Sequence, residues 1–256
     1  MRNVNKMAID IELYGKQFEK DYNNQDFEVI LTKYRKKKIV EIMANYITNN
    51  ILEIGCGMEP FFLCYDAFEK MTIVEPATVL FQSVERYCRE STKNIECIHD
   101  FVENREEELK EKKFDFILLV GLIHEVEDPE KLVQAVRAIC TEDTRVLITT
   151  NNPNSFHLTL AYEAGLIPKL GILTDKAKSF QRHSTFTMEQ MEKLAIRHSF
   201  QILEKGSYFI KPFAHSQMKA LLDQHIISEA VLDGLDKMVK YMPELGAENY
   251  CVVKPV

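Results

Sequence analysis

The residues best suited to chemistry begin with a glycine turn, Gly55-Cys56-Gly57, directly after the strand-like run Ile51–Ile54. Glycine tolerates positive φ, and without a side chain it lets a ligand lie directly against the backbone. A buried strand, a glycine turn and a helix start together hold nucleotide-like ligands at the carboxyl end of a parallel strand. Ordinary strand-to-helix turns share this pattern, so the turn predicts a ligand site only together with other residues.

A carboxylate stands at the end of the next strand-like run. Glu75 follows Met71–Val74 and lies 20 residues after Gly55. At about this offset an acidic side chain accepts hydrogen bonds from the ribose hydroxyls of a bound nucleoside. We therefore expect a ligand with an unphosphorylated ribose. The alternative is a solvated glutamate at a strand end.

Two further polar stretches follow strand-like runs. Asp100-Phe101 comes after Ile95–Ile98, where the carboxylate could accept from an exocyclic amine such as N6 of adenine and the ring could cover the base. A helix-capping aspartate is the alternative. His124 lies in the loop after the apolar run Phe114–Val120 and is our candidate general base. It could instead bond backbone and shape the loop, while Glu125 could orient it or cap the next helix.

Strand-like runs alternate with helical patterns over the first 150 residues, which predicts an α/β fold with a doubly wound, mostly parallel sheet. Ligands of such sheets bind at the carboxyl ends of the strands. The polar stretches at Gly55, Glu75, Asp100 and Gly121–His124 all fall on that edge, and their convergence is a stronger signal than any one of them.

The first 26 residues are polar, with aromatic side chains at Tyr14, Phe18 and Tyr22. Gly15 and the Asn23-Asn24 pair are expected to interrupt any long helix here. The segment is therefore expected to be either a loosely packed arm or a lid whose aromatics close over a ligand.

Residues 27–47 have helical spacing of apolar side chains, and a cationic cluster lies on the opposite face. This cluster, Lys33 and Arg35–Lys38, is expected to be solvated. Arg35 could instead reach a ligand carboxylate.

The pattern becomes less regular after Thr150, where we expect a helical cap inserted over the strand ends. Thr187 and Gln190 form a capping-box pattern at the start of a later helix. Residues 200–210 and 250–253 are expected to complete a seven-stranded sheet, the second of them inserted antiparallel. The expected parts are a lid arm (1–26), a cofactor-binding core (27–150), a cap that binds the acceptor (151–183), and the second half of the sheet (184–256) with a helical insertion (215–242).

The composition disfavours two classes of binding partner, nucleic acids and membranes. The chain has 256 residues, a net charge of −7 and a pI of about 5.6, so it gains little attraction to the phosphates of nucleic acid. We see no apolar run long enough for a bilayer and expect no membrane partner. The six cysteines form no C-x-x-C pair, which indicates reduced, buried thiols of a cytoplasmic protein and no metal site.

Taken together, these residues resemble the class I S-adenosylmethionine-dependent methyltransferases of the small-molecule type. The similarity rests on Glu53–Gly57, Val74–Pro76, Asp100-Phe101 and the stretch from Phe114 to Pro129. It implies that Gly55 and Gly57 lie against the methionyl part of the cofactor, Glu75 on its ribose and Asp100 near its adenine. The cofactor site that it implies consists of Tyr14, Glu53, Gly55, Cys56, Gly57, Glu75, Pro76, Asp100, Phe101, Gly121 and Leu122.

The sequence also departs from that family. Glu59 stands where a third glycine is usual, which changes the backbone of the loop near the methionine carboxylate. Pro60 removes the last glycine of a GxGxxG pattern, which argues against a nicotinamide dinucleotide. No Asn/Asp-Pro-Pro-aromatic tetrad follows the fourth strand, so methylation of nucleic-acid bases is disfavoured.

The resemblance implies methyl transfer to a small polar acceptor, and we expect an oxygen atom to receive the methyl group. His157, Tyr162, Arg182 and His183 are the candidate acceptor contacts, and an Arg-His pair would suit an anionic or phosphorylated acceptor. Two alternatives remain open. One is a nicotinamide- or other nucleotide-dependent enzyme on the same sheet, and the other is a non-catalytic module of methyltransferase type.

Overall fold

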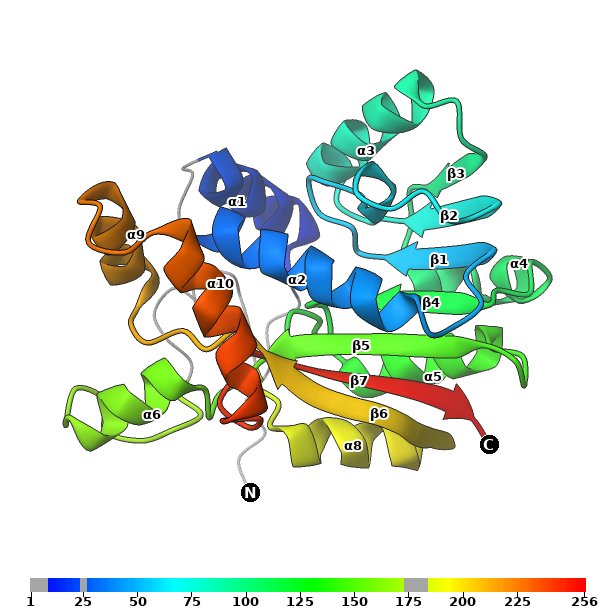
Figure 1. The fold of residues 1–256 in the computed structure, drawn as a ribbon. Helices are drawn as coiled ribbons and strands as arrows, with labels where there is room; N and C mark the ends of the chain where they lie inside the picture. Colours follow the sequence, from blue (N-terminus) through cyan, green and yellow to red (C-terminus); the bar gives the residue numbers. More distant parts are fainter. Residues whose placement is uncertain (1–8, 24–26, 173–183) are drawn as a thin grey trace.

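The computed structural model describes residues 9–23, 27–172 and 184–256, and a single mixed sheet forms the centre of this part of the chain (Figure 1). Its strands are β1 (Asn50–Ile54), β2 (Lys70–Val74), β3 (Ile95–Ile98), β4 (Phe116–Leu119), β5 (Arg145–Asn151), β6 (Phe200–Tyr208) and β7 (Glu248–Pro255). They lie in the order β3-β2-β1-β4-β5-β7-β6. Neighbours among β1–β5 are parallel, and β7 is antiparallel to both β5 and β6. The predicted doubly wound, mostly parallel, seven-stranded sheet is confirmed.

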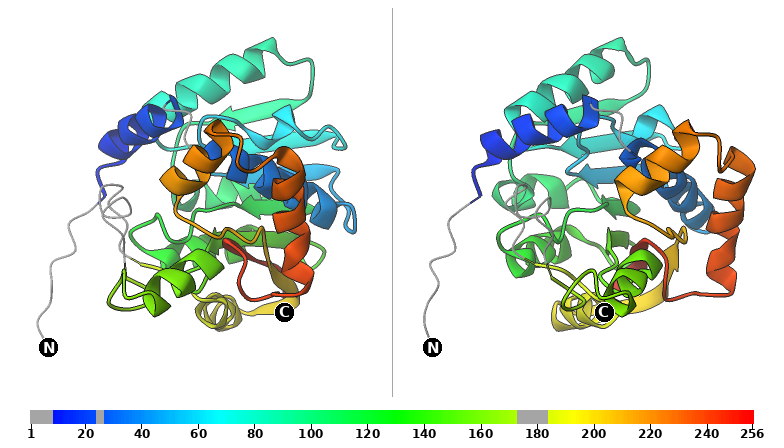
Figure 2. Two further views of the ribbon diagram at one scale, coloured as in Figure 1. Left: turned by 60° about the vertical axis from the view of Figure 1, so that its left-hand side comes forward. Right: turned by 90° about the vertical axis from the view of Figure 1, so that its left-hand side faces the viewer.

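Helices cover both faces of the sheet (Figures 1 and 2). One layer contains α2 (Glu28–Met43), the 3-10 helix η1 (Phe61–Leu63) and α3 (Thr78–Glu90), and the other contains α4 (Glu106–Lys110), α5 (Pro129–Ile139) and α8 (Met188–Arg197). Strand side chains alternate between the two layers, so Ile51 packs in one core and Leu52 in the other. All four residues of β4 are buried, as expected for a central parallel strand.

The predicted helix starts are also present. The Asp128 side chain accepts from the backbone N–H of Lys131, and Pro129 occupies the first position of α5. Thr187 and Gln190 form both hydrogen bonds of a capping box at α8. These local signals fix where each helix begins, and hence where the preceding loop leaves the sheet.

The remaining helices gather on the side of the sheet where β1, β2, β4 and β5 end (Figure 1). They are α1 (Ile11–Asn23), α6 (Phe156–Glu163), α9 (His215–Asp223), α10 (Glu229–Lys237) and the 3-10 helix η3 (Met238–Lys240), while η2 (Val102–Asn104) follows β3. The two helices expected between residues 215 and 242 are α9 and α10. In the stretch expected to be a cap, α6 has no buried residue.

Helix α1 corrects one expectation, because it runs unbroken through Gly15. A Cβ atom at Gly15 would lie 2.9 Å from Val79 and 3.0 Å from Ala77, so the glycine allows α1 to pack closely on α3. The two helices lie side by side in both views of Figure 2. Gly15 therefore allows close helix packing instead of breaking the helix, and α1 is docked on α3.

Two cysteines also differ from expectation. The sulfur atoms of Cys88, near the end of α3, and Cys97, in β3, are paired as a disulfide, whereas the sequence predicted six free thiols. The other four cysteines are free. Within the described ranges, no helix combines the length and apolar character needed to cross a membrane.

Candidate active site

A cavity of about 1390 Å³ opens at the carboxyl edge of the sheet. Pockets for one small ligand usually measure about 300–1,000 Å³, so this one has room for two molecules. We call the part around Gly55, Gly57 and Glu75 the glycine side, and the part around Asn151, His157 and Lys211 the β5 side. Residues of α1 and α2 line the cavity as well.

The glycine side has the backbone shape that the sequence predicted. Gly55 and Gly57 both have positive φ, 70° and 64°. The Gly55 N–H donates to the Val74 carbonyl at 2.9 Å, which ties the turn to the end of β2. A Cβ at Gly57 would lie 3.1 Å from the ring of Phe18 on α1. The turn therefore needs glycine both for its conformation and for the aromatic side chain packed over it.

Glu75 is a buried carboxyl group in the wall of the cavity. Its Oε1 accepts from the Ala77 N–H at 3.1 Å, and its Oε2 from the Gly57 N–H at 3.4 Å. Burial raises the pKa of Glu75 to about 7, although these two amides oppose the rise. The carboxyl group is thus positioned beside the glycine turn, with lone pairs that its two backbone donors do not use.

Glu53, at the same edge of β1, is buried too, and both its oxygens accept from the Phe61 N–H, at 3.1 and 2.9 Å. Burial raises the pKa of Glu53 to about 7. This contact closes the glycine loop onto η1 despite Glu59 and Pro60. Glu53 therefore stabilises the conformation of the glycine loop through the Phe61 amide, whereas Glu75 lies beside the glycine turn.

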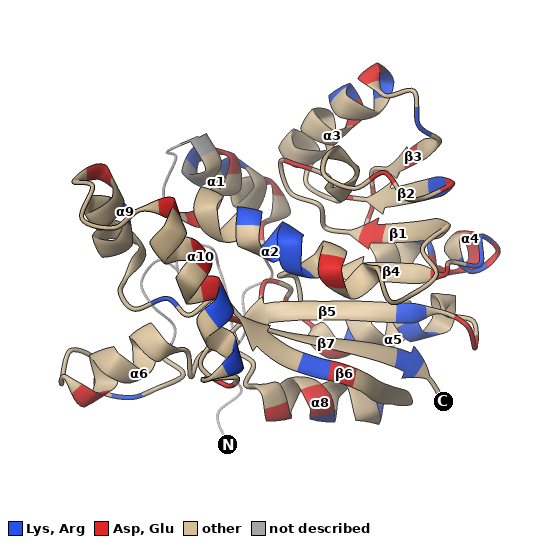
Figure 3. Ribbon diagram, viewed as in Figure 1, with Lys and Arg blue, Asp and Glu red and all other residues tan. Residues whose placement is uncertain are grey.

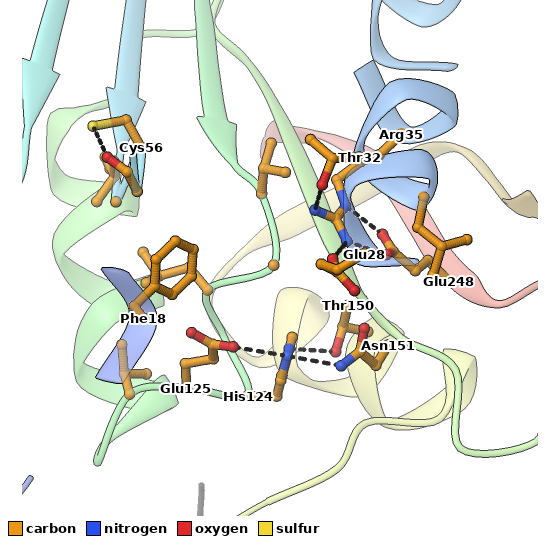
Figure 4. Close-up of a pocket in the computed structure, with 18 of the residues that line it drawn as sticks. Phe18, Glu28, Thr32, Arg35, Cys56, His124, Glu125, Thr150, Asn151 and Glu248 are labelled. Atoms are coloured by element: carbon orange, nitrogen blue, oxygen red, sulfur yellow. Dashed lines mark hydrogen bonds and ion pairs between the residues drawn. The ribbon is translucent and has the colours of Figure 1, made fainter. Parts of the chain in front are cut away.

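A chain of polar side chains links α1 to the end of β5. The Tyr14 hydroxyl donates to Glu125, whose Oε1 lies 3.6 Å from His124 Nε2. Figure 4 shows the His124 ring between Glu125 on one side and Thr150 and Asn151 on the other. Its Nδ1 lies 2.9 Å from Thr150 Oγ1, and its Nε2 lies 3.3 Å from Asn151 Nδ2.

These contacts hold the histidine ring in one orientation. The Thr150 hydroxyl faces Nδ1 and the Asn151 amide group faces Nε2, so both ring nitrogens have polar neighbours. His124 is only 4% exposed. The His124 ring is therefore buried and held in one orientation. Glu125 lies between this ring and α1, because it contacts both His124 and Tyr14.

Glu59, in place of the third glycine, has a specific environment. Lys36 on α2 donates to its Oε2 at 2.7 Å, and the Tyr22 hydroxyl on α1 donates to its Oε1. These two partners, Lys36 first, hold the pKa of Glu59 below its usual value despite partial burial. All three residues line the cavity. Glu59, at the position where the family usually has a glycine, is thus a carboxylate that links α1 and α2 to the glycine loop.

The cationic face of α2 is only partly solvated, which corrects the expectation for Arg35. Basic residues are concentrated along α2 (Figure 3), but the Arg35 guanidinium points into the structure. Its Nε donates to Glu248 of β7 at 2.8 Å and its Nη2 to Glu28 at 2.8 Å, as Figure 4 shows. Glu248 also accepts from the Tyr208 hydroxyl. Arg35 is thus a tie between α2 and the sheet.

The β5 side contains a second polar cluster. Lys211, in the segment after β6, is 3% exposed, and its Nζ lies 3.1 Å from His215 Nδ1. His215 Nε2 in turn lies 3.1 Å from Glu28 Oε2. His157, in the first turn of α6, has its Nδ1 3.0 Å from Ser155 Oγ. His157 is half-buried, and the loss of solvent around its ring lowers its pKa to about 2, with further contributions from Lys211 and His215.

The structure brings most of the predicted site residues to this cavity. Those that line it are Tyr14, Glu53, Gly55, Cys56, Gly57, Glu75, Pro76, Phe101, Gly121, Leu122, His124 and His157. Asp100 does not belong to the described lining: its oxygens accept from Phe101 N, Asn104 Nδ2 and Arg105 Nε at 2.7–2.8 Å. Tyr162 on α6 is 43% exposed and is also outside that lining. Arg182 and His183 lie outside the described residues.

Lys36, Lys211, His215 and Asn151 also line the cavity, but the sequence did not predict them as site residues, because none lies in a recognisable motif. Lys36 contacts Glu59 from 23 residues away, Asn151 contacts His124 from 27, and His215 contacts Glu28 from 187. Asp100 is the opposite case, because Asn104 and Arg105 four and five residues later are a local signal for a structural role.

Comparisons with known proteins agree with this arrangement. A family model described as "Methyltransferase domain" matches residues 22–209. A possible histamine N-methyltransferase from Thermotoga maritima has a similar structure, with a TM-score of 0.62, 18% identity and coverage of 95% of this chain and 99% of that chain. A methyltransferase from Clostridium acetobutylicum has a TM-score of 0.57, 13% identity and coverage of 93% and 98%. The plantazolicin methyltransferase BpumL, solved with S-adenosylhomocysteine, has a TM-score of 0.55, 14% identity and coverage of 96% and 95%.

No curated protein sequence gives a significant match. The similar structures share little sequence identity with this chain, so they show only that the fold is alike. The family match is of a different kind, because it extends over well more than half of the residues and includes the glycine turn, Glu75 and the His124 loop. The chain therefore belongs to the methyltransferase-domain family, whose methyl donor is S-adenosylmethionine.

Proposed function

We propose that the protein methylates an oxygen atom of a small polar metabolite. In this proposal S-adenosylmethionine occupies the glycine side of the cavity and the acceptor occupies the β5 side. The observation that carries the proposal is the pair of positive-φ glycines beside the buried carboxyl of Glu75, at the mouth of a cavity with room for two molecules.

The residues present fit the cofactor. Gly55 and Gly57 offer bare backbone to its methionyl part, and Glu75 offers lone pairs to its ribose hydroxyls. Phe101, half exposed at the cavity, offers a ring face for the adenine. Asp100, with both oxygens taken by neighbours, is left out of the proposed adenine contact.

S-adenosylmethionine supplies an already activated methyl group, so positioning is the main task of the protein. When bound, the cofactor would supply a methyl group whose transfer to the acceptor oxygen leaves the carbon–sulfur bonding pair on sulfur. The hydroxyl must also lose its proton in the course of the reaction. We assign this proton to Glu125, because a carboxylate has more lone pairs than the one that accepts from Tyr14, whereas both ring nitrogens of His124 already face Thr150 and Asn151. The His124 ring, held by Thr150 and Asn151, lies beside Glu125 and limits the positions of that carboxylate, so we treat His124 as its positioning residue.

Cofactor binding by calorimetry tests the function. The protein should bind S-adenosylmethionine and S-adenosylhomocysteine but not NAD. Gly55→Val should abolish this binding, since a side chain at φ 70° is strained and would meet Leu122 at 3.0 Å. Gly234→Ala, on an open face of α10, is the matched control and should bind normally. Binding of NAD in preference to S-adenosylhomocysteine would reject the proposal, and cofactor binding without turnover of any metabolite pool would favour a non-catalytic module.

Kinetics with an acceptor separates the two candidate bases. Glu125→Gln should lower kcat by roughly 10²–10⁴-fold, the usual contribution of a general base, while S-adenosylhomocysteine affinity changes little. His124→Asn should have a smaller effect, and a shifted pH profile should accompany it. If His124→Asn is the more severe variant and Glu125→Gln keeps full activity, the base is His124.

A further inference from the structure

We propose that the ion pair of Lys36 and Glu59 binds the amino-acid end of S-adenosylmethionine, with Lys36 on the carboxylate and Glu59 on the ammonium group. The proposal deepens the function above and rests on it for the identity of the cofactor. Ligands with and without the amino-acid end test the pair by binding alone, so no acceptor and no turnover are needed.

The first step concerns where the pair lies. Glu59 is the second residue after Gly57, whose backbone is assigned above to the methionyl part of the cofactor. Phe18 on α1 packs over Gly57, and Tyr22, one turn further along that helix, donates to Glu59. Lys36 reaches the same loop from α2, since its Nζ lies 2.7 Å from Glu59 Oε2. Lys36 and Glu59 both line the cavity, so the pair adjoins the part of the glycine side proposed for the methionyl group.

The second step concerns charge. The amino-acid end of the cofactor is a zwitterion, with a carboxylate and an ammonium group on one carbon atom. Lys36 and Glu59 present one cation and one anion side by side. A zwitterion that sets its carboxylate against Lys36 and its ammonium group against Glu59 gives every charge a neighbour of opposite sign. No charge then enters the cavity wall uncompensated, which would be costly.

The third step concerns hydrogen-bonding capacity. An ammonium group donates through several N–H bonds, and each carboxylate oxygen accepts at more than one lone pair. Glu59 accepts from Lys36 at Oε2 and from Tyr22 at Oε1, which orients the carboxylate without using all of its lone pairs. Contacts between the pair and the zwitterion would be charge-assisted and hence stronger than neutral ones. A glycine at position 59 would offer only backbone, so Glu59 gives this loop a side chain that distinguishes an amino-acid end from an alkyl group.

Calorimetry with S-adenosylhomocysteine and with 5′-methylthioadenosine tests the pair, because the second ligand keeps the nucleoside and the sulfur but has no amino-acid end. Lys36→Met should weaken S-adenosylhomocysteine binding roughly tenfold or more, as expected for lost hydrogen bonds between charged groups. It should leave 5′-methylthioadenosine binding unchanged. Glu59→Gln should have a smaller effect in the same direction, because its side chain is 39% exposed against 19% for Lys36.

Two variants serve as controls. Lys38→Met removes a cation from the same helix but outside the described lining, and it should bind both ligands as the wild type does. Lys36→Met leaves Glu59 without its cation, and that carboxylate could then repel the ligand. The double variant Lys36→Met/Glu59→Gln removes this repulsion and should still bind S-adenosylhomocysteine weakly.

Decarboxylated S-adenosylmethionine separates the two assignments, because it keeps the ammonium group and lacks the carboxylate. Lys36→Met should weaken binding of S-adenosylmethionine but not of the decarboxylated ligand. Glu59→Gln should weaken both. The reverse pattern, with the decarboxylated ligand depending on Lys36, would contradict the assignment of Lys36 to the carboxylate.

Two results would overturn the inference. Equal loss of S-adenosylhomocysteine and 5′-methylthioadenosine in Lys36→Met would mean that the pair only holds the glycine loop in shape. Unchanged S-adenosylhomocysteine affinity in that variant would mean that the pair makes no contact with the ligand. Both results require a wild type that binds. A wild type that binds neither ligand rejects the proposed function, and this inference with it.

Discussion

At the scale of single residues, Glu53 and Glu75 show how position separates two similar carboxyl groups. Burial raises the pKa of both to about 7. Both oxygens of Glu53 face one backbone amide inside the loop, whereas those of Glu75 accept from two different amides and stand beside the glycine turn. A bound ribose would therefore donate to Glu75 and favour its ionised form.

This difference predicts that cofactor affinity depends on pH. Ribose hydroxyls stabilise the carboxylate, so a protonated Glu75 must lose its proton on binding. Since its pKa is about 7 in the empty site, S-adenosylhomocysteine affinity should be full above pH 7 and fall by about tenfold per unit below it. Calorimetry at pH 6 and pH 8 measures the effect. Glu75→Gln should bind weakly with little pH dependence, whereas an unchanged pH profile in this variant would contradict the assignment.

At the scale of elements, α1 and α10 each contain one glycine, and the surroundings of these two glycines can be compared. A glycine in a helix is less favourable than alanine by about 0.5–1 kcal/mol. Gly234 in α10 has open space at its Cβ position, whereas Gly15 in α1 is packed against Val79 and Ala77 of the α3 region. The same substitution should therefore have opposite consequences in the two helices.

We expect Gly234→Ala to stabilise the protein by about 0.5–1 kcal/mol. Gly15→Ala should loosen α1 from α3 and draw Tyr14 away from Glu125, because contacts of 2.9 and 3.0 Å cannot be accommodated without a shift. Hydrogen exchange should then increase in residues 9–23 while the protection of β4 is unchanged. If α1 exchange in Gly15→Ala equals that of the wild type, close packing at Gly15 is not what docks the helix.

The elements themselves were largely predictable from the sequence, because they depend on local patterns. The run Phe114–Val120 contains β4, and Asp128-Pro129 marks the start of α5. The docking of α1 was not predictable, since the partner of Gly15 lies more than 60 residues further along the chain. The role of Arg35 was missed for the same reason: Glu248 is 213 residues away.

At the scale of the whole molecule, the Arg35–Glu248 contact joins the helix that precedes β1 to the strand that follows β6. Both side chains are largely buried, with Tyr208 as a third partner. Removing one member of a buried ion pair leaves the other charge uncompensated, at a cost of about 3–5 kcal/mol. This tie is therefore expected to contribute far more than the surface pairs on the same helix.

Urea denaturation should show this contrast within α2. Arg35→Met should lower the free energy of unfolding by about 3–5 kcal/mol. Lys38→Met removes the Lys38–Glu41 pair, which is more exposed, and should cost less than about 1 kcal/mol. Equal effects of the two substitutions would mean that Arg35 behaves as a surface residue. The double variant Arg35→Met/Glu248→Gln should recover part of the loss.

The position of β7 has a consequence for how the chain matures on the ribosome. β7 lies between β5 and β6 but is synthesised after both. Strand β6 therefore emerges before the neighbour to which it pairs, and Arg35 emerges long before Glu248. Domains generally fold as units, so the sheet can be completed only when this last strand has been made, and until then β6 and the buried arginine lack their partner.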